Sequence, residues 1–129
     1  MTSAHFGFTK LVVGDLERSA DFYKAVCGLV EQVRVKDSLA GRAISEILFQ
    51  PTAPGGPTFT LFSFLDTPAP ASSEVIVGFM TPDIAEFVAR VRAAGGSVLQ
   101  DIETRTEHGV KVALVLDIEG HMIEVVEFF

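Results

Sequence analysis

The architecture of this chain can be read from VGDLERSADFY at residues 13–23, where an apolar strand runs into a helix. Asp15 stands at the junction, and an aspartate in that position accepts a hydrogen bond from an N–H group of the first helical turn. The helical pattern continues to Gly28, and a glycine there readily adopts the left-handed conformation that ends a helix. The stretch therefore predicts a strand, a helix that begins after Asp15, and a turn at Gly28.

The second half of the chain repeats this pattern. GFMTPDI at residues 78–84 again carries a strand into an aspartate, Asp83, and the helix that follows ends at Gly95 and Gly96. Asp83 with Glu86 resembles a capping box, in which each side chain bonds the other residue's backbone N–H group. One apolar stripe of this helix is formed by Ile84, Phe87, Val88 and Val91. Self-similarity of this kind predicts two copies of one supersecondary unit.

Three strand-like segments follow each helix, and turn residues separate them. They span about 29–36, 42–50 and 58–65 in the first half, and about 97–103, 110–116 and 121–128 in the second. A linker rich in Pro, Ala and Ser lies between the halves at residues 66–73. We therefore predict an α+β fold within a single domain, 1–129. Two βαβββ modules, at about 4–66 and about 74–129, form a cradle-like mixed sheet with helices on its outer face.

The composition argues against several classes of partner. Of the 129 residues 48% are apolar, which suits a packed core, but no apolar run is long enough to cross a bilayer. The formal net charge of −7 disfavours nucleic acid, because no basic stripe is present to contact phosphates. No secretory signal is visible and the single cysteine, Cys27, has no partner for a disulfide, so a cytoplasmic location is expected. Cys27 is expected to be a small buried side chain rather than a reactive thiol.

Two motifs of the chain resemble the vicinal-oxygen-chelate superfamily, which includes the glyoxalases, bleomycin-resistance proteins and extradiol dioxygenases. The first is the strand–helix junction at residues 13–23. The second, DIEGHMIEV at 117–125, is similar to the superfamily's last hairpin, Asp-Pro-x-Gly-x-x-x-Glu, with Ile118 in place of the proline. These motifs are specific to the fold and not to any activity. The resemblance covers nearly the whole chain and implies a homodimer.

The resemblance also implies where a metal would bind, with one His, Gln or Glu ligand on the first and last strand of each module. These positions correspond to Phe8, about Thr60, Val77 (or Ile76, if Pro82 shifts the count) and Glu124. Only Glu124 is a good ligand, since Phe8 and Val77 carry no donor atom. We therefore expect no tightly bound divalent metal and no other cofactor, unless a displaced site uses another donor. The three histidines, His5, His108 and His121, are expected to be solvated.

Strand alternation predicts an apolar, aromatic-rich cradle around Glu124. Its lining is expected to include Phe6, Phe8, Lys10, Val12, Thr58, Thr60, Phe62, Phe64, Val75, Val77, Phe79, Met122, Glu124, Val126 and Phe128. The residues expected to bind a ligand are Phe8, Lys10, Thr60, Phe62, Val77, Phe79, Met122 and Glu124. The same aromatic side chains would also suit plain packing in a core or a dimer interface.

Three functions are compatible with this pattern. The first is a metal-free protein that binds a small hydrophobic or cationic molecule, similar to the antibiotic-binding branch of the superfamily. The second is a lyase, isomerase or dioxygenase in which Glu124 is the acid or base, or a residual metal ligand. The third is a structural or regulatory dimer whose cradle is packed solid. The sequence leaves open whether the chain is an enzyme.

Overall fold

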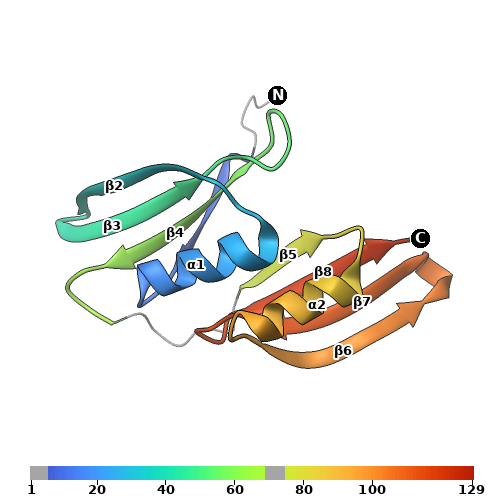
Figure 1. Cartoon of the computed structure of the whole chain (residues 1–129). Coiled ribbons are helices and arrows are strands. Elements are labelled where there is room, and N and C mark those ends of the chain that lie inside the picture. The colour runs from blue at the N-terminus through green and yellow to red at the C-terminus, as the bar shows by residue number, and fades with distance from the viewer. Residues whose placement is uncertain (1–5, 69–74) are drawn as a thin grey trace. The chain divides into compact units, whose positions relative to one another are not determined.

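The computed structural model describes residues 6–68 and 75–129, and its elements follow the predicted order (Figure 1). The first half contains β1 (Phe8–Val12), α1 (Leu16–Cys27), β2 (Glu31–Leu39), β3 (Arg42–Phe49) and β4 (Thr58–Phe64). The second half contains β5 (Ile76–Met80), α2 (Ile84–Ala93), β6 (Ser97–Arg105), the short 3-10 helix η1 (Thr106–His108), β7 (Val110–Leu116) and β8 (Met122–Phe128). The α+β class with two βαβββ modules is confirmed. His5 and most of the linker lie outside the described residues.

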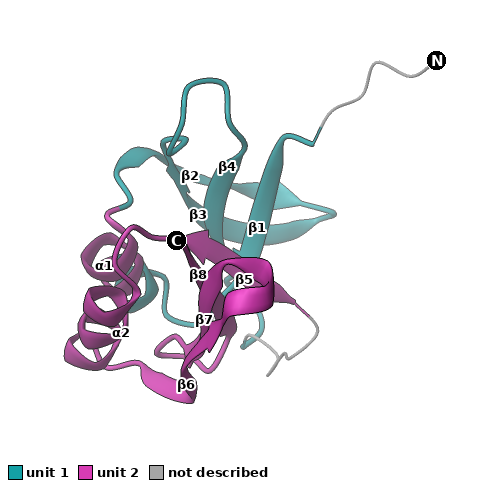
Figure 2. Ribbon diagram, turned by 90° about the vertical axis from the view of Figure 1, so that its right-hand side faces the viewer, with its two compact units in different colours: residues 1–20, 29–69 teal, residues 21–28, 70–129 magenta. Residues whose placement is uncertain are grey.

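Two compact units are present, and the boundary between them falls inside α1 (Figure 2). The first unit comprises residues 1–20 and 29–69, and the second comprises residues 21–28 and 70–129. The C-terminal part of α1 therefore belongs with the second sheet, where Arg90 Nε of α2 donates to the carbonyl oxygen of Val26 over 3.1 Å. Sequence spacing assigns all of α1 to the first module, and it gives no sign of this division.

Each unit holds one four-stranded sheet with the same topology. The first has the order β1-β4-β3-β2 and the second the order β5-β8-β7-β6. In each sheet the edge strand that precedes the helix pairs in parallel with the last strand of its module, and the other pairs are antiparallel. Since residues paired across adjacent strands project to the same face, these registers decide which side chains can share a site.

The helix ends form where the aspartates and glycines predict them. Asp15 Oδ1 accepts from the N–H group of Arg18 over 3.0 Å, and Asp83 Oδ1 accepts from that of Glu86 over 3.1 Å. Gly28 and Gly95 have φ angles of 67° and 91°, which favour glycine. The capping box, however, is only half formed.

The carboxylate of Glu86 pairs with Arg90 over 3.2 Å, while the Asp83 N–H group donates to Thr81 Oγ1. A second carboxylate takes part at the start of α2, because Glu127 Oε1 on β8 accepts from the Ile84 N–H group over 2.7 Å. Negative charge at this end of a helix is stabilising. No helix in the described part of the chain is long and apolar enough to span a membrane.

Candidate functional site

The first sheet brings four of the predicted ligand-binding residues onto one face. Phe8 pairs with Thr58, Lys10 with Thr60 and Val12 with Phe62, so Phe8, Lys10, Thr60 and Phe62 project to the same side, as predicted. We call this side the Lys10 face. Thr60 and Phe62 are buried at 1% and 3% exposure, whereas Phe8 is 58% exposed at the sheet edge.

Glu46 also lies on the Lys10 face, and sequence reasoning missed it. It pairs with Phe62 across β3 and β4, and its carboxylate lies 2.9 Å from Lys10 Nζ. Alternation along β3 could have revealed it, since Glu46 is the one acidic side chain between Ile44 and Leu48 on a face that is otherwise apolar there.

The register of the second sheet corrects the predicted position of two residues. On β5, Ile76 pairs with Met122 and Gly78 pairs with Glu124, so Val77 and Phe79 project to the opposite side from Glu124. The prediction that Val77 and Phe79 share a face with Glu124 is therefore wrong. The additional residue at Pro82 shifts by one the count from Asp83 back to β5. Of the two positions considered, Ile76 is therefore the one that shares a face with Glu124.

Val77 and Phe79 instead face α2 and the end of α1. The Phe79 ring lies 6.3 Å from that of Tyr23 and 6.4 Å from that of Phe87, measured between centroids. Phe79 also lines a cavity of about 280 Å³ with Cys27, Phe87 and Arg90. Burial raises the pKa of the Cys27 thiol to about 12, which supports an unreactive cysteine in this cavity.

Glu124 lies on the other side of the second sheet, which we call the Glu124 face. Its neighbours across the sheet include Leu114 on β7 and Gly78 on β5, and Met122 and Val126 flank it on β8. The Glu124 side chain is half-buried, and no hydrogen bond or ion pair joins it to any described residue of its unit. A carboxylate with apolar neighbours and no partner is costly unless something else compensates its charge.

The side chains at the expected metal-ligand positions do not fit a divalent metal. Phe8 and Ile76 have no donor atom, and Thr60 offers only a hydroxyl. Among residues 6–68 and 75–129, no three His, Cys, Asp or Glu side chains gather where they could hold a metal ion. Of the expected ligand positions, only Glu124 carries a good donor for such a metal.

Next to Glu124 in sequence, the turn between β7 and β8 is built around a buried aspartate. Asp117 Oδ1 accepts from the N–H groups of Glu119 and His121, over 2.8 and 2.9 Å. Its Oδ2 accepts from Tyr23 Oη over 2.8 Å and lies 2.9 Å from His121 Nδ1. His121 is 6% exposed, so the prediction that it is solvated is wrong, whereas His108 is exposed as predicted.

This arrangement changes the acid–base properties of both partners. Burial opposes the ionisation of Asp117, but hydrogen bonds from His121 and Tyr23 outweigh it and hold the pKa of Asp117 below its usual value. Burial, followed by the negative charge of Asp117, raises the pKa of Tyr23 far above its usual value. The role of Tyr23 as a hydrogen-bond donor could not be read from the sequence.

Tyr23 permits a direct optical test, because the chain has one tyrosine and no tryptophan. A solvated tyrosine ionises near pH 10, at about its reference pKa. We expect no tyrosinate absorbance from the folded protein through that pH, and its appearance only as the chain unfolds at higher pH. The raised pKa means that the stabilisation is complete below about pH 10 and is lost as the pH rises further. Titration near pH 10 in native buffer, as occurs in urea, would contradict this assignment.

Comparison with known proteins adds a family and a fold. The model of the Glyoxalase/Bleomycin resistance protein/Dioxygenase superfamily matches residues 4–125. No curated protein matches the chain. A glyoxalase family protein from Bacillus cereus superimposes with a TM-score of 0.85 at 19% identity, over 100% of this chain and 99% of that one.

Two further solved structures have the same fold. A hypothetical protein from S. aureus matches with a TM-score of 0.69 at 26% identity, over 98% of this chain and 99% of its own. A mutant glyoxalase I from Zea mays matches with a TM-score of 0.70 at 22% identity, over 94% of this chain but only 45% of its own. At these identities the likeness to solved structures is evidence of fold and not of activity.

Proposed function

Since this chain belongs to the Glyoxalase/Bleomycin resistance protein/Dioxygenase superfamily, we propose that it is a metal-free member that binds a small hydrophobic or cationic molecule. The observation that carries this proposal is Glu124, a half-buried carboxylate with apolar neighbours and no partner among the described residues of its unit. An ammonium group on an apolar ligand would supply the missing counter-charge. The side chains of Met122 and Val126 would contact its apolar part.

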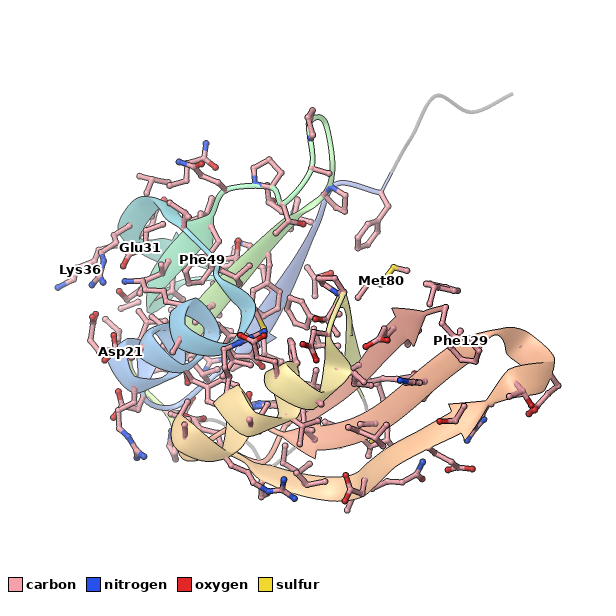
Figure 3. The ribbon with its side chains drawn as sticks, turned by 45° about the vertical axis from the view of Figure 1, so that its right-hand side comes forward. Asp21, Glu31, Lys36, Phe49, Met80 and Phe129 are labelled. Atoms are coloured by element: carbon pink, nitrogen blue, oxygen red, sulfur yellow. The ribbon has the colours of Figure 1, made fainter. Side chains whose placement is uncertain are left out.

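Apolar exposure on the second sheet supports a ligand-binding role for the Glu124 face. Ile76 and Met80, which share this face with Glu124, are 56% and 69% exposed, and Figure 3 shows Met80 at the end of its strand. Apolar surface of this kind around a few polar groups is typical of small-molecule sites. The same exposed apolar surface is also suited to self-association. A homodimer and a cytoplasmic location are part of the proposal, and light scattering tests the homodimer.

Benzylamine and toluene form a matched pair of probes for Glu124, because they share a phenyl ring and only benzylamine is cationic. We expect benzylamine to bind about tenfold more tightly than toluene, as one charge-assisted contact allows. In Glu124→Gln this preference should disappear while toluene binding is retained. Calorimetry or NMR titration measures both affinities.

Glu107→Gln is the control, since it makes the same change of charge at an exposed position in η1. It should keep the preference for benzylamine. Equal affinity of the native protein for both probes, or a preference that survives in Glu124→Gln, would overturn the role of Glu124.

The same carboxylate is also the observation that favours an enzyme as the second candidate. Because no described residue of its unit binds the Glu124 carboxylate, this group could accept a proton from a bound substrate or donate one to it. Glutamine keeps the shape and removes the acid. Once a reaction is found, unchanged turnover in Glu124→Gln would exclude Glu124 as its acid or base.

A further inference from the structure

The Lys10 face contains a charged pair, Lys10 and Glu46, that lies outside the two superfamily motifs. Lys10 Nζ lies 2.9 Å from Glu46 Oε1 and 3.5 Å from Oε2, so a single ammonium serves both oxygens. Glu46 Oε1 is fully buried, and no described residue donates a hydrogen bond of good geometry to it, so its contact with Lys10 is an ion pair. It joins two non-adjacent strands, β1 and β3, across β4.

Such a pair contributes little to stability. The Glu46 side chain is only 11% exposed, and removing a carboxylate from water costs several kcal/mol that the partner repays only in part. Apolar residues of similar size would pack on this face at least as well. The pair is therefore better explained by a requirement for polar chemistry at this position than by a requirement of folding.

The two partners differ in accessibility. The Glu46 side chain is largely buried, whereas the Lys10 side chain is 35% exposed. The Lys10 ammonium lies 5.2 Å from the ring centroid of Phe62 and 5.7 Å from that of Phe8. An ammonium has three N–H groups, and Glu46 engages one side of it. A donor thus remains available beside the exposed Phe8 ring.

We infer that the Lys10 face binds the carbonyl oxygen of a neutral aromatic compound, with Lys10 as the hydrogen-bond donor and Phe8 in contact with the aromatic ring. This inference rests on the proposed binding of a small molecule, though not on the role of Glu124, and it names a ligand class for residues of the first unit. A neutral acceptor fits better than an ion, because Lys10 and Glu46 together carry no net charge. Glu46 offsets much of the attraction that Lys10 would exert on an anion, and Lys10 repels a cation.

Acetophenone and ethylbenzene test this inference, since they have similar size and only acetophenone carries an acceptor oxygen. We expect the native protein to bind acetophenone about tenfold more tightly, as one hydrogen bond to a charged donor permits. In Lys10→Met this preference should disappear, so that acetophenone and ethylbenzene bind about equally, with the affinity for ethylbenzene retained. NMR titration measures both, and the shifted resonances should include those of Phe8 and Lys10.

A double variant covers the case in which Lys10→Met leaves Glu46 unpaired and the chain fails to fold. Lys10→Met with Glu46→Leu removes both charges, and it too should lose the preference for acetophenone. A native protein that binds both probes equally, or binds neither, overturns the inference, as does a preference that survives in the double variant.

Glu124→Gln separates this inference from the proposed function. It should abolish the preference for benzylamine and leave the preference for acetophenone unchanged. Loss of the acetophenone preference in Glu124→Gln would show that the carbonyl does not depend on Lys10 alone, and it would overturn the assignment. A protein that selects acetophenone but not benzylamine supports the Lys10 face and contradicts the role given to Glu124.

Discussion

Asp117→Ala is expected to lower the free energy of unfolding by about 4 kcal/mol, as is typical when a buried, hydrogen-bonded charge is removed from its partners. The substitution removes the carboxylate that accepts hydrogen bonds from the Tyr23 hydroxyl and from the backbone N–H groups of Glu119 and His121. Loss of a buried hydrogen bond of this kind costs about 1–3 kcal/mol, and relaxation of the turn recovers part of the sum. Chemical denaturation followed by circular dichroism measures the loss.

Asp101→Ala is the matched control in the same unit. Asp101 is exposed, and within the described part of the chain its carboxylate accepts only from the neighbouring N–H group of Ile102, over 2.8 Å. We expect a change within about 0.5 kcal/mol there, as for most surface positions. A similar loss in both variants would mean that the buried network around Asp117 has no special weight.

The pH dependence of this difference follows from the lowered pKa of Asp117. Because the folded value lies below the unfolded value of about 3.9, the contribution of the carboxylate is complete above that pH. It is lost as the pH falls through the folded pKa. The gap in stability between the native protein and Asp117→Ala should therefore narrow on acidification below about pH 4.

Gly96→Ala should lower the free energy of unfolding by about 3 kcal/mol, because the site has no room for a methyl group. A Cβ atom on Gly96 would lie 2.5 Å from the carbonyl oxygen of Leu116, 2.8 Å from Val91 Cγ1 and 2.9 Å from Phe22 Cε2. The oxygen belongs to the backbone of β7, so it cannot move aside as a flexible side chain would. Thermal denaturation would show a lowered midpoint.

Gly78→Ala provides the comparison on the same sheet. Among the described residues, no atom other than those of Gly78 and its two chain neighbours lies within 4 Å of the Cβ position, and the Gly78 backbone is not left-handed. This variant should be as stable as the native protein or slightly more so, since alanine has less conformational entropy to lose in folding. An equal loss in both variants would attribute the effect to strand flexibility and not to the close approach at Gly96.

The sequence by itself determined those features that depend on local physics. Asp15 and Asp83 begin the helices, and Gly28 and Gly95 end them, because capping and left-handed turns involve only neighbouring backbone groups. Period-two alternation placed Phe8, Lys10, Thr60 and Phe62 on one face, and the register confirms it. The repeated pattern gave the two βαβββ modules and, through the end motifs, the superfamily.

Only the tertiary structure decided features that depend on register or on contacts between distant segments. The additional residue at Pro82 shifts the register of β5 by one position from the predicted one, so Val77 and Phe79 project toward the helices. A shift of one residue has this effect because successive side chains of a strand project to opposite faces. The pairing of Tyr23 with Asp117 joins residues 94 positions apart, and no local pattern specifies such a contact. Glu46 and Lys10 meet for the same reason, across a strand that separates them in the sheet.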